Sequence, residues 1–307
     1  MKKIISLLLT ALICLTLGGC AFGGRKTALV VSGAEVDTEI YNYYLDLVAQ
    51  RPQDYGLTDK SGSGDRRDKA VELCRKYVAF NTVFAERGLS LTNSEKLEIA
   101  DNVNNFWSMS AEHYKDIGVS RVTLNKIFTE QAYEDTLFEA DFDKGMDDAE
   151  AESAVKAFFY SNYTAFRNIC EYFTASDGSK VSEQEKQNIT NKFSEIAASS
   201  GSSYDDFTNT CAAAGYTASG TVILKKDSGG YPEGFFLKVY TMAPGTVGIF
   251  TYDDCIFCIR KESLSDLGEE VYYNYRSTCI RNMYEESWQE AVENYLSGFT
   301  VDEVKIK

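Results

Sequence analysis

The sequence contains few groups that could do acid–base or metal chemistry. Its one histidine, His113, lies among Ser110, Glu112 and Tyr114. A lone imidazole in such a polar stretch is typical of an exposed surface residue rather than of a catalytic base or a metal ligand. The sequence shows no set of His, Cys, Asp and Glu residues at the spacing of a zinc site. We therefore expect neither a metal nor any other cofactor.

A Cys-x-x-Cys motif, Cys255 to Cys258, is the second candidate for chemistry. Redox versions of this motif lie where a strand leads into a helix N-terminus, which lowers the pKa of the thiol. Here both cysteines lie in an apolar run, 255–260, that predicts a β-strand. Side chains three residues apart on a strand point to opposite faces, so this pair can neither form a disulfide nor share a metal without distortion. We favour a structural role over a redox role.

The remaining cysteines leave their redox state open. The chain has eight cysteines, of which Cys14 and Cys20 lie near the N-terminus. An even number outside the cytoplasm permits disulfides, but the scattered spacing matches no small disulfide scaffold, and buried free thiols are an equal alternative. We predict no pairing among the other six, which are Cys74, Cys170, Cys211, Cys255, Cys258 and Cys279.

The N-terminal residues have the pattern of a secretion signal. Lys2 and Lys3 precede an apolar stretch, 4–17, that is too short to span a bilayer as a mature helix. It ends in Leu-Gly-Gly-Cys20, which resembles the bacterial lipobox, where the cysteine thiol takes a diacylglyceryl group. The alternative is an ordinary signal anchor with an incidental cysteine. We expect residues 1–19 to be a lipoprotein signal peptide and Cys20 to carry acyl chains such as palmitate, which would anchor an extracytoplasmic protein to the cell membrane.

The chain is distinctly acidic. It has 31 Lys and Arg against 46 Asp and Glu, a net charge of −15. Loss of Lys2 and Lys3 with the leader would leave 29 against 46, or −17. Such a charge repels nucleic acid and anionic lipid headgroups and favours basic or partly unfolded polypeptide partners. We therefore expect no nucleic-acid partner.

The first half of the chain after a tether, 20–27, shows mainly helical periodicity. A strand, turn and strand over 28–36 lead into a helix that Asp37 and Thr38 can cap. Thr92 and Glu95 have the spacing of a capping box. The expected helices that follow span about 65–88, 93–115, 120–143 and 148–161. Residues 28–160 are therefore predicted to form one helical lobe.

The second half mixes strands with helices. Helices are expected from Ser182, over 204–214 and near Pro232, and strands over about 169–173, 221–225, 247–251 and 255–260. The helical period then returns in one long helix over about 269–297, which should pack on the first lobe. The last residues, 299–306, could pair with the N-terminal strand.

This order of elements resembles the PrsA and SurA type of extracytoplasmic foldase, in which a parvulin-type (PpiC-like) prolyl isomerase domain interrupts a helical chaperone lobe. The resemblance rests on Val30 to Val36 before a helix, on the strand at 169–173 after an acidic helix, and on the Pro244-Gly245 turn before two closing strands. It implies an α+β fold. A SurA-N-like helical lobe, 28–160, would be completed by 263–307, and a degenerate parvulin-like domain, 161–262, would be inserted between them.

The same resemblance implies a site. A parvulin domain holds one histidine in its first strand and one in its last, facing each other beneath a proline pocket lined by Met and Phe. Here the motif places Glu171 on the first histidine, and Phe257 or, within one residue, Ile256 on the second. Phe235 falls on the family phenylalanine and Tyr231 on its methionine. A glutamate on a strand is otherwise typical of a solvent-facing residue.

These residues leave the catalytic role uncertain. Losing both histidines removes the hydrogen-bonded array that orients the pocket, so we expect weak prolyl isomerase activity or none. The resemblance implies a membrane-anchored chaperone that binds unfolded or secreted client polypeptides. Alternatives are an active isomerase with an altered site and a lipid-anchored scaffold for one specific partner. With 20 Tyr and 18 Phe, most aromatic residues must be core, but some could line an exposed groove, among them Tyr41, Tyr43, Tyr44, Trp107, Tyr272, Tyr273 and Tyr275.

Overall fold

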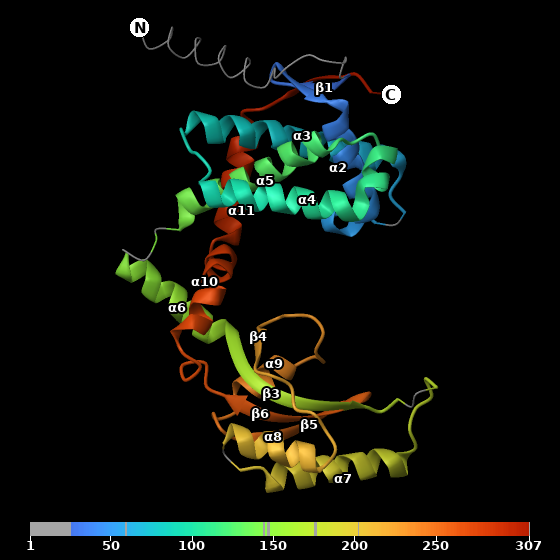
Figure 1. Cartoon of the computed structure of the whole chain (residues 1–307), viewed down its shortest axis with the longest axis vertical. Helices are drawn as coiled ribbons and strands as arrows, with labels where there is room; N and C mark the ends of the chain where they lie inside the picture. The colour runs from blue at the N-terminus through green and yellow to red at the C-terminus, as the bar shows by residue number, and fades with distance from the viewer. Residues whose placement is uncertain are drawn as a thin grey trace. The chain divides into compact units, whose positions relative to one another are not determined.

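The protein was analysed as a computed structural model that describes residues 26–58, 60–143, 145, 148–174, 177–201 and 203–306. The predicted signal peptide and Cys20 lie outside the described residues. The chain divides into two compact units (Figure 1). The first, here called the helical unit, is Met1–Lys144 with Tyr284–Lys307, and the second, the sheet unit, is Gly145–Met283. None of the helices that the structure describes is both long and apolar enough to cross a membrane.

A small antiparallel sheet joins the two ends of the helical unit. Its strands are β1 (Thr27–Val31), β2 (Ala34–Asp37) and β7 (Val301–Val304), in the order β2-β1-β7. Ser32 and Gly33 connect β1 to β2 with φ angles of 47° and 80°, the left-handed values of a tight hairpin turn. The backbone N–H of Gly33 donates to Asp302 Oδ2 at 2.7 Å, which ties this turn to β7. The pairing of the C-terminal residues with the N-terminal strand is therefore confirmed.

The rest of the helical unit is built from helices whose ends follow their capping residues. They are α2 (Thr38–Gln50), α3 (Ser63–Glu86), α4 (Asn93–Asp116) and α5 (Arg121–Phe142), with a short 3₁₀ helix, η1 (Pro52–Tyr55). Asp37 caps α2 by accepting from Glu39 N–H at 3.0 Å. Thr92 and Glu95 form the predicted capping box at the start of α4. Ser110 has non-helical angles, so α4 is kinked there.

The C-terminal helical region is two helices, and the prediction of a single helix is wrong. They are α10 (Glu269–Met283) and α11 (Glu285–Ser297), separated at Tyr284, whose φ and ψ are −109° and 15°. The ring of Tyr284 stacks on Phe142 at 5.3 Å between centroids. Trp288 of α11 packs against Phe80 and Phe138, at 6.2 and 5.5 Å. The expectation that the C-terminal helix packs on the helical lobe is confirmed for α11.

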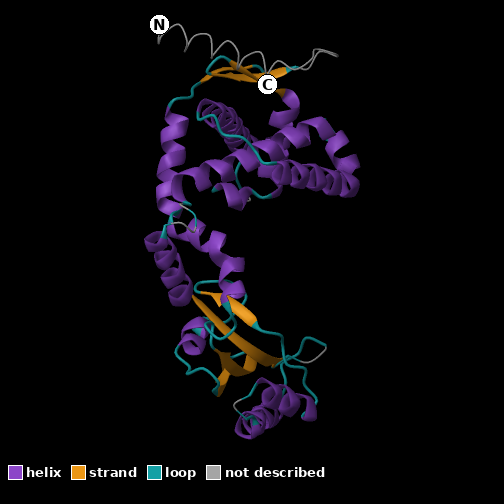
Figure 2. Ribbon diagram, turned by 60° about the vertical axis from the view of Figure 1, so that its left-hand side comes forward, coloured by secondary structure: helices purple, strands orange, loops and turns teal. Residues whose placement is uncertain are grey.

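The sheet unit is built around an antiparallel sheet, whose strands are orange in Figure 2. The order of its strands is β4-β3-β6-β5. Its strands are β3 (Tyr163–Tyr172), β4 (Val222–Lys225), β5 (Val247–Thr251) and β6 (Cys255–Glu262). The helices α7 (Glu183–Ser199) and α8 (Tyr204–Ala213) pack on one face, and α9 (Phe235–Tyr240) packs on the other. The expected α+β class is confirmed. The strand β3 begins six residues earlier than the predicted start at 169.

The remaining helix, α6 (Ala149–Asn162), lies with α10 in the sheet unit. Glu152 of α6 accepts from Tyr272 Oη at 2.5 Å and from Arg276 Nε at 2.8 Å. The sequence placed domain boundaries at 160/161 and 262/263, whereas the compact units divide at 144/145 and 283/284. The difference arises because α6 and α10 pack on each other.

Candidate functional site

The central strands of the sheet unit have two buried faces. Along β6, Cys255, Phe257 and Ile259 pack in the cluster beneath α9, whereas Ile256 and Cys258 pack in the cluster beneath α7 and α8. This alternation follows from the two-residue period of a strand. Cys255 and Cys258 therefore lie on opposite faces of the sheet, as their spacing predicts, and both thiols are free.

The five candidate pocket residues divide between these faces. In the β3–β6 register, Glu171 lies opposite Ile256. Ile256 packs beneath α7 and α8, and Glu171 accepts a hydrogen bond from the hydroxyl of Tyr216, which belongs to the same cluster. Glu171 is half-buried rather than solvent-facing. Glu171 and Ile256 are therefore separated by the sheet from the other three candidates.

Tyr231, Phe235 and Phe257 share the face that α9 covers. The β3 residue opposite Phe257 is Cys170, one position before Glu171. The family motif had placed Glu171 opposite Phe257, and this assignment differs from the observed register by one position. Only the pairing register of β3 with β6 reveals it, because side chains on neighbouring positions of a strand face opposite ways.

Aromatic rings pack on one another at this face. The ring of Phe235 stacks on Tyr231 at 4.4 Å and meets Phe257 at 4.9 Å and Phe166 at 5.5 Å between centroids. Phe235 is 1% exposed and Phe257 5% exposed, whereas Tyr231 is half-buried. We call these four residues the ring cluster. Phe235 lies at its centre, and its ring contacts the rings of the other three.

Burial shifts the pKa of each ionisable group beside the ring cluster in the direction that favours its neutral form. The thiols of Cys170 and Cys255 share a hydrogen bond, and burial raises the pKa of Cys170. Burial, followed by the neighbouring Asp254, raises the pKa of Cys255 to about 12. Burial also lowers the pKa of Lys261, opposite Phe166, to about 8. Protonated thiols are poor nucleophiles, and the buried ammonium of Lys261 donates to the Thr164 hydroxyl.

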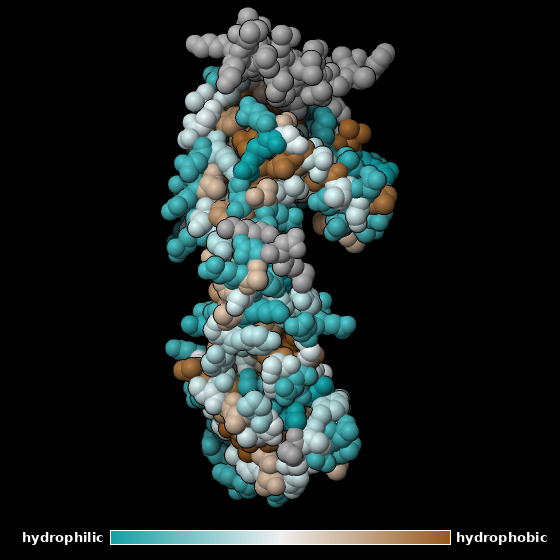
Figure 3. Space-filling model, turned by 90° about the vertical axis from the view of Figure 1, so that its left-hand side faces the viewer, coloured by the Kyte–Doolittle hydropathy of each residue, from teal (hydrophilic) through white to brown (hydrophobic). Residues whose placement is uncertain are grey.

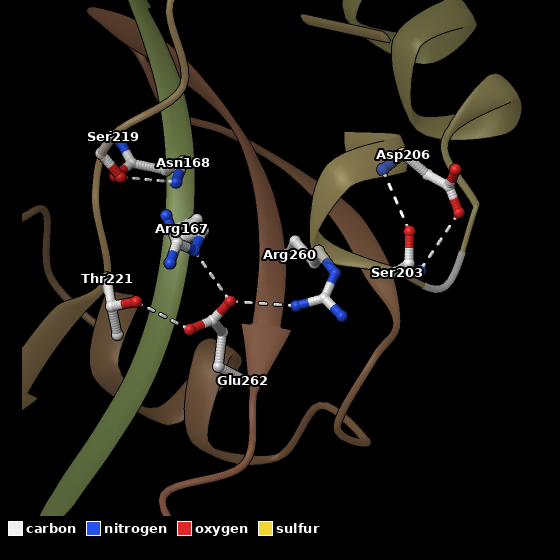
Figure 4. A network of polar contacts seen from close by, with 8 residues as sticks. All are labelled: Arg167, Asn168, Ser203, Asp206, Ser219, Thr221, Arg260 and Glu262. Atoms are coloured by element: carbon white, nitrogen blue, oxygen red, sulfur yellow. Dashed lines mark hydrogen bonds and ion pairs between the residues drawn. The ribbon is translucent and has the colours of Figure 1, made fainter. Parts of the chain in front are cut away.

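A polar network occupies one end of the opposite face (Figure 4). Glu262 accepts from Arg167 Nε at 2.9 Å, from Arg260 at 3.0 Å and from the Thr221 hydroxyl at 3.0 Å. The guanidinium of Arg167 also lies 3.6 Å from the centroid of the Tyr204 ring. The Glu262 carboxylate therefore links β3 to β6, and the contact of Arg167 with Tyr204 adds α8. We interpret this network as structural.

The lone histidine belongs to the helical unit rather than to the sheet unit. Its exposed side chain contacts the carboxylate of Asp46, with 2.9 Å between His113 Nε2 and Asp46 Oδ2. The predicted surface position of His113 is therefore confirmed. Among the described residues, no group of three or more His, Cys, Asp or Glu side chains could hold a metal ion.

Of the aromatic residues proposed for an exposed groove, several are in the core. Tyr41, Tyr44 and Tyr272 are buried, and Trp107 is half-buried. Tyr273 remains 39% exposed. The ring of Trp107 stacks with Tyr114 at 6.4 Å between centroids. The buried residues Tyr41, Tyr44 and Tyr272 therefore cannot line an exposed aromatic groove.

Comparison with known proteins gives similarities of fold only. No model of a known protein family matches the sequence, and no curated protein matches it. Among solved structures, the foldase protein PrsA of Streptococcus pneumoniae is similar at 13% identity, with 89% of this chain and 93% of that chain covered and a TM-score of 0.41. For PrsA of Lactococcus lactis these values are 11%, 91%, 95% and 0.42, and for PrsA of Bacillus subtilis they are 10%, 93%, 96% and 0.29.

Proposed function

We propose that this chain is a lipid-anchored extracytoplasmic chaperone that holds unfolded or secreted polypeptides without catalysing prolyl isomerisation. The observation that carries the proposal is the ring cluster. Rotation about a peptide bond crosses a barrier of about 18–20 kcal/mol, and an enzyme lowers it by binding the twisted amide more tightly than the planar one. On this face Phe235 lies at the centre of the rings, and the paired residues of β3 and β6 are Cys170 and Phe257 rather than two histidines, which supports holding without catalysis.

The surface supports a binding role. It is mostly hydrophilic on the face seen in Figure 3, with smaller hydrophobic areas, and the whole chain carries a net charge of −15. The charge favours solubility, while single apolar side chains are available for contacts with extended polypeptides. The most exposed of these in the two units are Met109 at 74%, Leu97 at 68%, Leu237 at 64% and Tyr172 at 63%.

The holding function can be tested together with catalysis. The chain from residue 21 onward contains every described residue and can be added to a denatured, unrelated protein as that protein is diluted into buffer. We expect light scattering from aggregates to fall with increasing chaperone, and no acceleration of cis-to-trans conversion in a proline peptide. Acceleration that is lost in Phe235→Ala would instead support an active isomerase.

Two further results separate the remaining alternatives. Failure to suppress aggregation of several unrelated proteins, combined with stable capture of one partner, would support the scaffold. The anchor is tested by cell fractionation of the full chain and its Cys20→Ala variant. We expect the wild-type chain in the membrane fraction and the variant outside it, and equal distributions would overturn the lipid anchor.

A further inference from the structure

Two thiols from different strands lie together on the face of the sheet that α9 covers. Cys170 of β3 lies directly opposite Phe257 of β6. Two positions earlier on β6, Cys255 lies opposite Tyr172. Cys170 and Cys255 are therefore diagonal neighbours on one face, and their thiols share a hydrogen bond. We call Cys170 and Cys255 the thiol pair.

The diagonal offset of the thiol pair decides how its sulfurs can be joined. Diagonal neighbours on antiparallel strands are about 7–8 Å apart, and their Cβ atoms are somewhat closer. A disulfide needs the Cβ atoms within about 3.5–4.5 Å, so it would require the strands to shift. Two metal–sulfur bonds in a line span about 4.6 Å if each has the length of about 2.3 Å found for zinc and thiolate. The offset therefore suits an ion between the sulfurs better than a direct bond.

The number and type of ligands select the class of ion. Thiolates are soft ligands, which select Cu(I), zinc and iron–sulfur clusters. Structural zinc sites and iron–sulfur clusters take four ligands, whereas no group of three or more His, Cys, Asp or Glu side chains among the described residues could hold a metal. The Asp254 carboxylate, which hydrogen-bonds Cys255, is a hard ligand. A soft monovalent ion, which two thiolates in a line can satisfy, is therefore the complementary ligand.

The surroundings of the thiol pair allow an ion to enter and favour its retention. Cys170 is half-exposed, whereas Cys255 is 2% exposed. The rings of Phe235 and Phe257 belong to the same buried cluster, so the inner side of the pair is apolar. Two bare thiolates would place two negative charges there, which is costly. One bound cation leaves a single negative charge shared by both sulfurs.

We propose that the thiol pair binds one soft monovalent cation of the Cu(I) class, with Cys170 and Cys255 as its two ligands. Binding is a substitution, in which each S–H bond breaks, each sulfur forms one bond to the ion, and two protons leave to solvent. The ion keeps its charge and its oxidation state, so no oxidant or reductant takes part. The site is independent of the proposed chaperone function.

The ion site is tested by competition for Cu(I) without oxygen. The chain from residue 21 onward, which contains every described residue, is titrated against a coloured chelator of Cu(I). We expect one equivalent of Cu(I) to move from the chelator to the protein. After excess chelator removes the ion, the number of free thiols should equal that of the untreated protein. Absence of transfer would overturn the proposal, and so would a thiol count lower by two, because it would indicate a disulfide instead of an ion.

Matched cysteine variants locate the bound ion. Cys170→Ser and Cys255→Ser each remove one ligand, whereas Cys258→Ser changes a buried thiol on the opposite face of the sheet. Loss of an outer-shell partner already lowers metal affinity about 10–100-fold, so loss of a ligand should weaken Cu(I) binding at least about 100-fold. Cys258→Ser should leave the Cu(I) affinity unchanged. Equal losses in all three variants, or no loss in Cys170→Ser, would refute the assignment. Hydrogen exchange of β6 checks that each variant is folded.

A protection assay on the wild-type chain does not depend on the folding of a variant. An alkylating reagent is added with and without one equivalent of Ag(I), and mass spectrometry identifies the modified cysteines over time. We expect Ag(I) to slow the modification of Cys170 at least about tenfold, because the ion occupies the thiolate that the reagent attacks. Modification of Cys170 at the same rate with and without Ag(I) would show that the thiol pair holds no ion.

Discussion

The stability of the helical unit should depend on the protonation of one buried carboxyl group. Glu130 of α5 is 4% exposed and accepts a hydrogen bond from Tyr44 Oη at 3.2 Å. Burial, followed by the charge of Glu134, raises the pKa of Glu130 from its ordinary value of 4.5 to about 8. The ionisable groups that influence it come from three helices, and they are Tyr44, Lys76, Tyr77, Glu134 and Asp135.

The sign follows from proton binding. Between pH 4.5 and 8 the unfolded chain releases the Glu130 proton and the folded chain keeps it. The free energy of unfolding therefore falls as pH rises through this window, by up to about 1.4 kcal/mol per pH unit. At pH 7 the loss amounts to about 3 kcal/mol. Glutamine is neutral at every pH and can still accept from Tyr44, so Glu130→Gln should remove this pH dependence.

The assay can observe the helical unit alone. The chain has 2 tryptophans, Trp107 and Trp288, and both lie in the helical unit. Denaturant unfolding followed by tryptophan fluorescence at pH 5, 6, 7 and 8 gives the free energy of unfolding of that unit. Relative to wild type, we expect Glu130→Gln to be more stable by about 1 kcal/mol at pH 5 and by about 3 kcal/mol at pH 7. Glu290→Gln, an exposed control on α11, should follow the wild-type profile.

Two results would refute this reasoning. Parallel pH profiles for wild type and Glu130→Gln would mean that Glu130 does not hold its proton differently in the folded and unfolded chains. A variant that is less stable than wild type at every pH would mean that the buried amide leaves a polar group unsatisfied, a cost of about 1–3 kcal/mol that outweighs the gain.

Three further outcomes concern the sheet unit. Burial lowers the pKa of Lys261 from 10.5 to about 8, so hydrogen exchange of β6 should show wild-type stability rising with pH over that window, and Lys261→Met should lack the rise. Glu262→Ala should destabilise the sheet unit by about 3–5 kcal/mol because Arg167 and Arg260 lose their shared carboxylate, measured by the same exchange. A thiol reagent should modify half-exposed Cys170 before the other free thiols, and Cys170→Ser should remove that first phase.

The elements that could be predicted from the sequence are those with local signals. Thr92 and Glu95 mark the start of α4, and the Ser32-Gly33 turn marks the first hairpin. The start of β3 has no such signal, because Tyr163, Thr164, Ala165 and Phe166 are all buried and give no alternation of polar and apolar residues. Tyrosine is not a helix-breaking residue, so the break at Tyr284 between α10 and α11 follows from packing rather than from helix propensity.

The candidate site required a register that a single strand does not encode. The motif placed Glu171 in the pocket, whereas pairing with β6 places Cys170 on the face of Phe257. An error of one residue reverses the face of every side chain on a strand. Phe235 and Tyr231, which the sequence placed by their spacing to Gly245, do share one face of the sheet and stack on each other, because a short helix and its turn have a local sequence pattern.

The ring cluster contributes to the stability of the sheet unit and sets what a client chain can reach. Clearing the Phe235 side chain from the cluster would cost about 3–5 kcal/mol, the usual penalty for removing a buried phenylalanine. A proline that enters from solvent would first have to separate Tyr231 from Phe235, losing an aromatic pair contribution of about 0.5–1.5 kcal/mol. Surface stacking on Tyr231 is therefore open to a client chain, whereas Phe257 stays covered. The packing that holds α9 on the sheet is thus the basis of the proposed holding of clients without catalysis.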